Sequence, residues 1–308
     1  MQIRNFVWYV LSKPLGDPGE LAAKLSDHRF KPCNHQQQMS QGWVAPVGDE
    51  LVYEAHGAQL LMLKQEKRLL PGSVVNEYLQ QKIEHFEAEE GYKPGRKVRQ
   101  QMKDDLIIEL LPKAFTKSSR IPVLVFPRQG WLLVLGGSAK TAEDATTFLR
   151  TSLGSLPTAL VNVDMSPSHQ MTRWLMDPLT LPADWMLGEE VELVDEEKAT
   201  VKVRNQDLLG DELTVHTQAG KVVSKLALVW REQVSLLLQE DLAVKRIKLL
   251  LEDDEPLVDG DDADAKFAHE FAISCNWVVP LCESLLTAFG GLDKALSGSQ
   301  ERAFAGSL

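Results

Sequence analysis

The sequence predicts an α+β fold in which antiparallel or mixed sheets pack against helices. Apolar runs of strand length and of helix length follow one another without the regular βαβ alternation of a parallel sheet. Residues 221–230 and 233–239 are two such runs joined through Arg231 and Glu232, which is typical of an antiparallel hairpin. No repeat of about 20–50 residues is evident, which argues against a solenoid or a propeller.

The composition is that of an ordinary globular protein. Of the 308 residues, 44% are apolar and 25% are charged, and a chain of this length predicts about two domains. The net charge of −11 excludes a histone-like coat of positive charge, and the 7% of aromatic residues leaves few rings for stacking single-stranded bases. The three cysteines are too few and too scattered for a disulfide framework, which predicts a reducing, cytoplasmic location. No run of 18 apolar residues occurs, so we expect no membrane span.

The first part of the chain mixes predicted strands and helices. The strands are residues 5–11, 43–47, 59–64, 121–126, 131–135 and 160–163, and the helices are residues 19–26, 71–89, 96–111 and 141–152. Pro71 is tolerated in a first helical turn, and Pro112 ends the helix before it. Thr141 and Asp144 resemble a capping box, and Gly154 ends that helix.

The second part is rich in strands and ends in a long helix. Pro167, Pro178 and Pro182 predict a loop-rich crossing into it. The predicted strands are residues 191–194, 200–203, 221–230, 233–239 and 244–251, followed by a helix over 265–289 and a polar tail. We therefore predict a first α+β lobe from residues 1–70 and 121–165, a helical hairpin with a basic face at 71–120, and a second lobe at 166–308.

Positive charge gathers in residues 93–120 of this acidic chain. The segment holds eight basic and three acidic residues, a net charge of +5. In a helix, Arg96, Arg99 and Lys103 form one stripe with no acid at i+4. The apolar residues Val98, Met102 and Leu106 form an adjacent packing stripe. A second basic cluster, Lys198, Lys202 and Arg204, lies on a predicted strand. Such local excess predicts a footprint for a polyanion, most plausibly nucleic acid, and its alternative is a solvated helix face.

Motifs for catalysis or metal binding are not found. The segment 136–141 follows a strand and opens a helix, but Ala139 stands where a phosphate loop needs glycine before Lys140. Cys275 and Cys282 are seven residues apart in an apolar helix, which predicts core side chains. Adjacent carboxylates such as those at 189–190 point different ways and predict solvated surface. We therefore predict no catalytic residue, no metal and no cofactor.

Two other functions stay open at this point. The segment 252–264 holds eight acidic residues and no basic one, so it can dock a basic protein partner, although such runs are commonly solvated loops. A phosphate at the helix start near Lys140 is the remaining enzymatic hypothesis.

Several short blocks between Phe6 and about Gly291 match one known family in roughly collinear order. They are residues 30–33 (FKPC), 42–46 (GWVAP), 110–115 (LLPKAF), 138–140 (SAK), 142–144 (AED), 149–150 (LR), 152–157 (SLGSLP), 206–208 (QDL), 219–228 (AGKVVSKLAL) with Trp230, and 245–248 (KRIK). On these blocks the chain resembles the RdgC family, the recombination-associated proteins of Gram-negative bacteria.

The resemblance implies a ring-shaped homodimer that encircles duplex DNA with little sequence preference and restrains strand exchange by RecA. It implies a nucleoid-associated protein without a catalytic site, with the hairpin as a basic finger. Phe115 matches a phenylalanine that closes the ring at a subunit contact, and Gln206 matches a polar residue on the DNA side. Asn205 stands where the family tends to have lysine, and Arg204 and Lys202 are the neighbouring residues that can supply that charge. The predicted DNA-binding residues are Lys93, Arg96, Lys97, Arg99, Lys103, Lys113, Lys117, Arg120, Lys202, Arg204 and Gln206.

Overall fold

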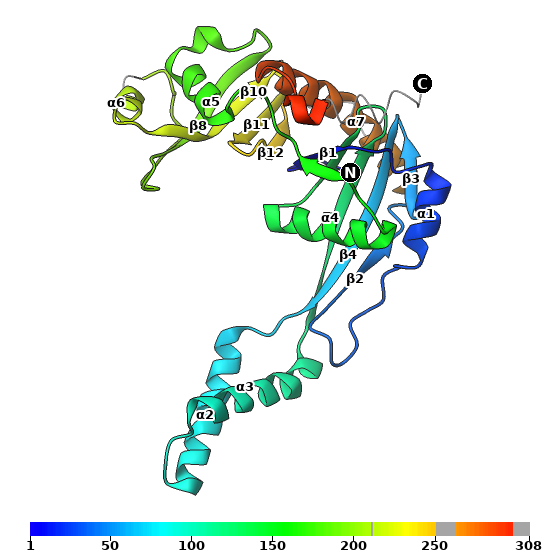
Figure 1. The fold of residues 1–308 in the computed structure, drawn as a ribbon, viewed down its shortest axis with the longest axis vertical. Helices are drawn as coiled ribbons and strands as arrows, with labels where there is room; N and C mark the ends of the chain where they lie inside the picture. Colours follow the sequence, from blue (N-terminus) through cyan, green and yellow to red (C-terminus); the bar gives the residue numbers. More distant parts are fainter. Residues whose placement is uncertain (211, 251–262, 298–308) are drawn as a thin grey trace.

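Two antiparallel sheets form the frame of the molecule (Figure 1). The computed structural model describes residues 1–210, 212–250 and 263–297. The first sheet has the order β2-β4-β5-β6-β1-β7, with β3 paired to the first residues of β4. Its strands are β1 (Val7–Leu11), β2 (Met39–Val44), β3 (Val52–Ala55), β4 (Ala58–Arg68), β5 (Thr116–Phe126), β6 (Trp131–Val134) and β7 (Thr158–Leu160). The predicted α+β class with antiparallel sheets is confirmed.

The second sheet has the order β12-β11-β10-β8-β9. Its strands are β8 (Trp185–Val194), β9 (Thr200–Arg204), β10 (Val222–Trp230), β11 (Val234–Gln239) and β12 (Val244–Leu249). The predicted hairpin is confirmed, since β10 pairs β11 and places Leu226 opposite Leu238. Arg231 and Glu232 both have positive φ, the backbone twist that suits a tight antiparallel turn.

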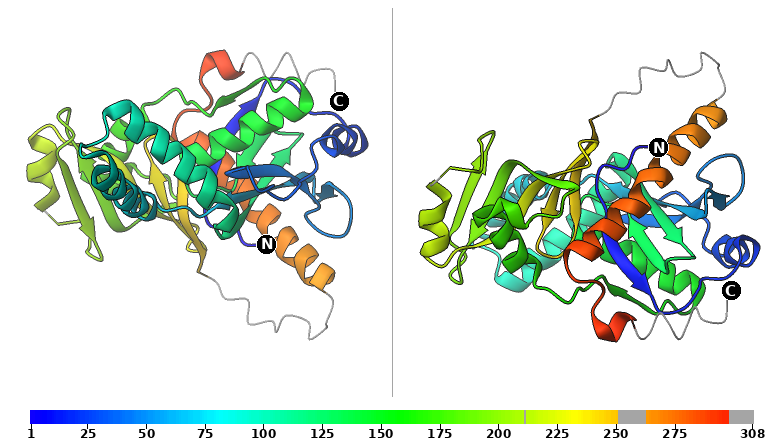
Figure 2. Two further views of the ribbon diagram at one scale, coloured as in Figure 1. Left: turned by 90° about the horizontal axis from the view of Figure 1, so that it is seen from below. Right: turned by 90° about the horizontal axis from the view of Figure 1, so that it is seen from above.

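Helices cover both faces of the first sheet. Helices α1 (Pro18–Ser26) and α4 (Ala139–Leu153) bury Leu21 and Leu149 against one face. Helix α7 (Ala263–Ala288) and the second sheet share a larger core on the other face, where Phe271 packs in one cluster with Phe6. Both views in Figure 2 show α7, in orange, lying across the junction of the sheets. A backbone bridge between Phe6 and Val244 joins the two sheets directly.

A helical finger projects from the far end of β4 and β5 (Figure 1). These two strands pair along their whole length, from Gln59 opposite Val125 to Arg68 opposite Thr116. The finger consists of α2 (Gly72–Glu90), α3 (Arg96–Leu110) and the 3-10 turn η1 (Leu111–Lys113). The guanidinium of Arg68 donates to the carbonyls of Leu111 and Ala114 at 3.0 and 3.2 Å. These bonds fix the base of the finger to the strand from which it emerges.

Helix α7 is long and apolar enough to cross a membrane by length and composition alone. Its buried residues nevertheless pack in the main core, including Phe271, Val278 and Leu285. A buried core helix passes the same test of length and composition, so this is weak evidence for a membrane span.

Several element predictions need correction. Helix α5 (Pro167–Met176) lies in the crossing predicted to be loop-rich, because Pro167 occupies its first turn and begins the helix rather than excluding it. Helix α6 (Glu212–Gln218) and strand β3 have no counterpart among the predictions. Strand β5 begins at Thr116 rather than residue 121, and Ser138 caps α4 instead of Thr141. The division into domains stays a prediction.

Candidate nucleic-acid interface

Helix α3 places the predicted basic stripe along the line where it packs against α2 in the finger. Gly91, in the left-handed conformation at φ 75°, ends α2 and lets the chain turn back into α3. Arg96, Arg99 and Lys103 then line one groove of about 270 Å³, together with Leu79 of α2. The helical phase thus brings the three predicted cations to the same place. The packing stripe beside them is only partly as predicted, since Leu106 is buried but Val98 is exposed.

The cations in this groove are not neutralised by acidic residues of the described structure. Among the described residues, none forms an ion pair with Arg96, Lys97, Arg99 or Lys103. The two aspartates of α3 are hydrogen-bonded to glutamines instead, with Gln100 donating to Asp104 at 2.8 Å and Gln101 donating to Asp105 at 2.9 Å. The stripe therefore presents charge that no neighbouring carboxylate neutralises.

The ends of the finger are less positive. Lys93 lies 4.0 Å from Glu87, and Lys113 lies 3.9 Å from Glu109, which also pairs with Lys82 at 3.0 Å. The hydrogen bond and charge of Lys82 lower the pKa of Glu109. Two of the predicted contact residues, Lys93 and Lys113, are thus partly neutralised within the hairpin.

Paired strands at the base of the finger add four further cations. Lys117 and Arg120 of β5 are exposed, and β4 places Lys67 opposite Lys117 and Lys64 opposite Arg120. Like charges directly opposite on paired strands are destabilising, so folding alone does not favour this arrangement. Lys64 and Lys67 were not among the predicted contacts. The sequence KQEKR at 64–68 could have indicated them, because it carries a net positive charge and lies within the strand once that strand is extended from residue 64 to Arg68.

Phe115 is the most exposed aromatic side chain at the base of the finger. It keeps 85% of its surface accessible, next to Leu69 at 49%. Its carbonyl accepts a hydrogen bond from the amide of Leu69 at 2.7 Å, which holds the backbone while the ring points outward. An exposed ring on an ordered backbone suits a contact with another protein surface.

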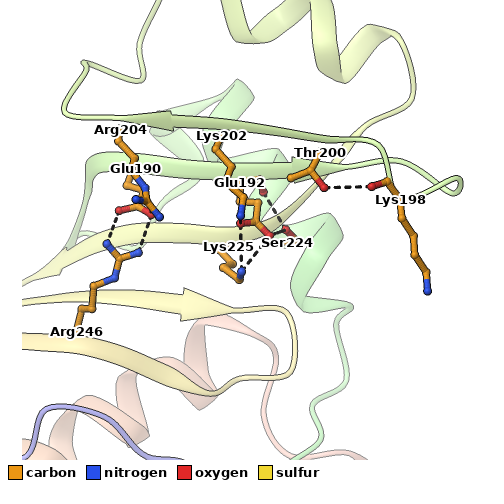
Figure 3. A network of polar contacts seen from close by, with 9 residues as sticks. All are labelled: Glu190, Glu192, Lys198, Thr200, Lys202, Arg204, Ser224, Lys225 and Arg246. Carbon is orange, nitrogen blue, oxygen red and sulfur yellow. Dashed lines mark hydrogen bonds and ion pairs between the residues drawn. The ribbon is translucent and has the colours of Figure 1, made fainter. Parts of the chain in front are cut away.

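Two glutamates neutralise part of the second basic cluster, at Lys202 and Arg204 (Figure 3). Glu190 accepts from Arg204 Nε at 3.1 Å and from both terminal nitrogens of Arg246 at 2.6 Å. Glu192 pairs with Lys202 at 2.9 Å and Lys225 at 3.0 Å.

The two glutamates owe their low pKa values to these cations. The hydrogen bonds from Arg246 are the main cause for Glu190. For Glu192 burial acts in the raising direction, but the bonds from Lys202 and Lys225 outweigh it. Both carboxylates are therefore ionised at neutral pH and neutralise part of the cluster.

Other predicted residues lie outside this network. The Lys198 side chain points away from it in Figure 3. Gln206 is exposed, and its amide donates to Glu212 at 2.9 Å. Cys275 and Cys282 are buried as predicted, and burial raises the pKa of Cys275 to about 11. The acidic segment 252–264 lies almost entirely outside the described residues, which resume at residue 263.

The fold and its charges define the class: a two-sheet α+β protein that presents unpaired cations on a protruding helical hairpin. Comparison with known sequences then places it, because a family model described as "Putative exonuclease, RdgC" matches residues 1–292. The chain belongs to the RdgC family.

Named relatives span nearly the whole chain. The recombination-associated protein RdgC of Edwardsiella ictaluri is 36% identical over 279 residues, which is 88% of this chain and 92% of that protein. That of Tolumonas auensis is 34% identical over 300 residues, or 94% and 99%. That of Yersinia pestis (strain Pestoides F) is 33% identical over 296 residues, or 94% and 97%.

The family model's description and the relatives' names point in different directions on catalysis. The former names an exonuclease, whereas the latter name a recombination-associated protein. Within the part of the chain that the structure describes, no group of three or more His, Cys, Asp or Glu is placed to hold a metal ion. The prediction of a non-enzymatic protein stays a prediction.

Proposed function

We propose that this protein binds duplex DNA without sequence preference and acts in homologous recombination. The observation that carries the proposal is the stripe of Arg96, Arg99 and Lys103, which lines one groove without ion-pair partners among the described residues of a net-acidic chain. Sequence-neutral binding requires lysine and arginine on phosphates and few side chains that read bases. The family's association with recombination supports the biological setting.

We further propose that two copies enclose the duplex. The exposed Phe115 at the base of each finger is the contact that closes the ring, and the basic fingers border the DNA path. A two-fold dimer suits a duplex because the two DNA backbones also look alike when the duplex is viewed from either end. By occupying DNA, the dimer restrains RecA-driven strand exchange. This places the protein in the cytoplasm on the nucleoid, with duplex DNA and a second copy as partners and RecA as a competitor.

The test is duplex binding as a function of salt. If the protein contacts Z phosphates, the logarithm of the association constant falls with the logarithm of salt with a slope of about −0.9Z. Binding that does not respond to salt would refute the proposal.

Charge reversal on the finger provides a second test of duplex binding. The triple variant R96E/R99E/K103E is expected to lose affinity for all sequences alike. Lys24→Glu, an exposed charge reversal on α1, is the control and should bind as the parent does. Equal loss of affinity per reversed charge in the two variants would show that overall charge, and not the finger, governs binding.

Catalysis is tested separately, because the family description raises it. We propose binding without strand cleavage, so end-labelled duplex incubated with Mg²⁺ or Mn²⁺ should stay intact. Cleavage that tracks the protein through purification would establish a nuclease instead.

Removal of residues 252–262 tests the alternative of an acidic docking segment. Loss of a captured protein partner, with DNA binding unchanged, would favour that alternative.

A further inference from the structure

A second pocket lies where the start of α4 meets the face of the second sheet. Its volume is about 290 Å³, and residues 137–139 form one wall. Five basic side chains from the second sheet line it: Lys202, Arg204, Lys225, Lys245 and Arg246. Three acidic residues, Glu190, Glu192 and Asp241, also line it, which leaves an excess of positive charge. Of these, Lys225, Lys245 and Arg246 had no predicted role in binding.

The ammonium group of Lys245 is buried beside this pocket without a hydrogen-bond partner among the described residues. The Lys245 side chain is half-buried, and the Nζ atom at its end is inaccessible to solvent and donates no hydrogen bond within the described residues. Burial lowers the pKa of Lys245, and the charge of Asp241 opposes that shift. Removing an ammonium group from water without an acceptor is costly, so such groups are normally paired. A lysine in this state, at a cation-lined pocket, matches a site that an anion completes.

Glu190 and Glu192 take the positions that an anionic ligand needs. Arg246 holds Glu190 through both terminal nitrogens at 2.6 Å, the two-pronged geometry with which arginine also binds phosphate (Figure 3). Glu192 lies between two lysines, 2.9 Å from Lys202 and 3.0 Å from Lys225. Two carboxylates shared among four cations satisfy only part of the available donors.

The start of α4 adds hydrogen-bond donors to the opposite wall. Ser138 caps this 15-residue helix and accepts the amide of Thr141 at 3.1 Å. The first amides of a helix have no partner within it, and the helix dipole places partial positive charge there. Ala139, the first helical residue, lies in the pocket wall. The pocket therefore joins donors from both lobes of the molecule.

We propose that this pocket binds a phosphate group of the DNA backbone, with Lys245 as its buried cation and with Glu190 and Glu192 as internal competitors for the arginines and lysines. The inference rests on the proposed function for the source of the phosphate. It adds a contact between the two lobes, away from the finger. A weakly binding anion cannot displace the two carboxylates from the basic side chains. A phosphate of a polyanion that other contacts already hold nearby has a high effective concentration and can displace them.

The first test replaces Lys245 with methionine, which keeps the side-chain length and removes the charge. With a blunt duplex lacking terminal phosphates, Lys245→Met should bind about tenfold more weakly, and the salt slope should decrease in magnitude by about 0.9. Its melting temperature without DNA should stay the same or rise by about 2 °C, because an unpaired buried charge is removed. Lys248→Met, on the same strand but outside the pocket lining, is the control and should bind like the parent.

Parental affinity and slope in Lys245→Met would overturn the proposal. The reversal R96E/R99E/K103E, measured beside it, keeps the two hypotheses apart. Loss of binding in the finger variant alone leaves the proposed function standing and rejects the pocket.

A second variant tests the competing carboxylate. Glu190→Gln keeps the shape but weakens the hold on Arg204 and Arg246, so duplex affinity should rise several-fold. A fall in affinity would show that Glu190 positions the arginines for DNA, and would overturn its role as a competitor.

The source of the phosphate is separated with two other probes. A 5′-phosphorylated duplex that binds more tightly than the unphosphorylated one, only when Lys245 is present, would assign the pocket to a strand end. Inorganic phosphate that raises the melting temperature of the parent but not of Lys245→Met, relative to chloride at equal ionic strength, would show a phosphate site even if the protein binds no duplex. Lack of any response to all three probes would overturn the pocket assignment.

Discussion

On the finger, Arg96, Arg99 and Lys103 line a groove without an ion-pair partner among the described residues, whereas on the second sheet Lys202 and Arg204 each hold a carboxylate. The two regions look alike in the sequence, where both are short runs of lysine and arginine. In the fold they differ because β8 carries two glutamates into the second cluster. The cations of the finger can bind a phosphate directly, whereas those of the second sheet must first give up a glutamate carboxylate.

This difference bears on what each region contributes to binding. An exposed cation that neutralises a phosphate releases a counterion condensed on the DNA, which favours binding at low salt. A cation already paired with glutamate must first lose that partner, so its net gain is smaller. We therefore expect the finger to supply most of the affinity, with the second sheet acting after DNA has arrived.

Neutralising three cations of the finger and two of the second sheet gives the largest expected effect and the most direct test of the comparison. The finger variant R96Q/R99Q/K103Q should bind a duplex about a thousandfold more weakly, if each charged contact contributes about 1.4 kcal/mol. The sheet variant K202Q/R204Q should lose less than about tenfold. Both are measured by titration of a labelled duplex at one salt concentration. Similar losses of affinity per removed charge would mean that ion pairing within the sheet does not limit its binding to DNA.

Phe115→Ala tests whether the finger has a second role at its base. Truncation of an anchor at a subunit contact typically costs about 2–4 kcal/mol, so the dimer should dissociate at concentrations where the parent stays associated. Sedimentation over a range of concentrations measures this. Leu160→Ala removes a 52% exposed apolar side chain on β7 of the first sheet and serves as the control. An unchanged dimer in Phe115→Ala would remove that residue from the subunit contact.

The pH dependence of the free energy of unfolding tests the ion pairs of the second sheet. The cations lower the pKa values of Glu190 and Glu192 below the unfolded value of about 4.3. Their ionised forms therefore stabilise the fold above that pH, and the contribution is lost as the pH falls through the folded-state values. In Glu190→Gln, the free energy of unfolding should be lower by about 1 kcal/mol at pH 7, with the gap narrowing below pH ~4.

Urea denaturation at pH 7 and pH 3.5 measures that gap. Glu109→Gln, which breaks an exposed pair on the finger, should change stability less. A gap that persists unchanged at pH 3.5 would contradict an electrostatic origin.

Local patterns predicted the finger well, because its limits depend on neighbours in the chain. Proline, glycine and helical phase place α2 and α3 within a residue or so of their observed bounds, and the phase of Arg96, Arg99 and Lys103 follows from spacing alone. The β10–β11 hairpin is local for the same reason. Strand β3, with four residues, is too short for its alternation to be recognised.

Partners distant in sequence could not be predicted in this way. Glu190 and Arg246 are 56 residues apart, and nothing near either of them indicates that β8 and β12 bring them together. The pairing of Lys67 with Lys117 also depends on strand register, which the sequence leaves open until both strands are given their full length. The candidate site was thus predictable where one helix builds it and not where a sheet does.

The strands at the base of the finger allow the finest test of the comparison. Lys117 faces Lys67 across β4 and β5, and like charges at that spacing oppose folding. Lys117→Glu replaces this repulsion with attraction, so the free energy of unfolding should rise by about 0.5 kcal/mol while duplex affinity falls several-fold. Lys117→Gln should give about half of each change. Stability and affinity that fall together would show that Lys117 supports the fold, whereas opposite changes would show that these strands tolerate repulsion for the sake of DNA.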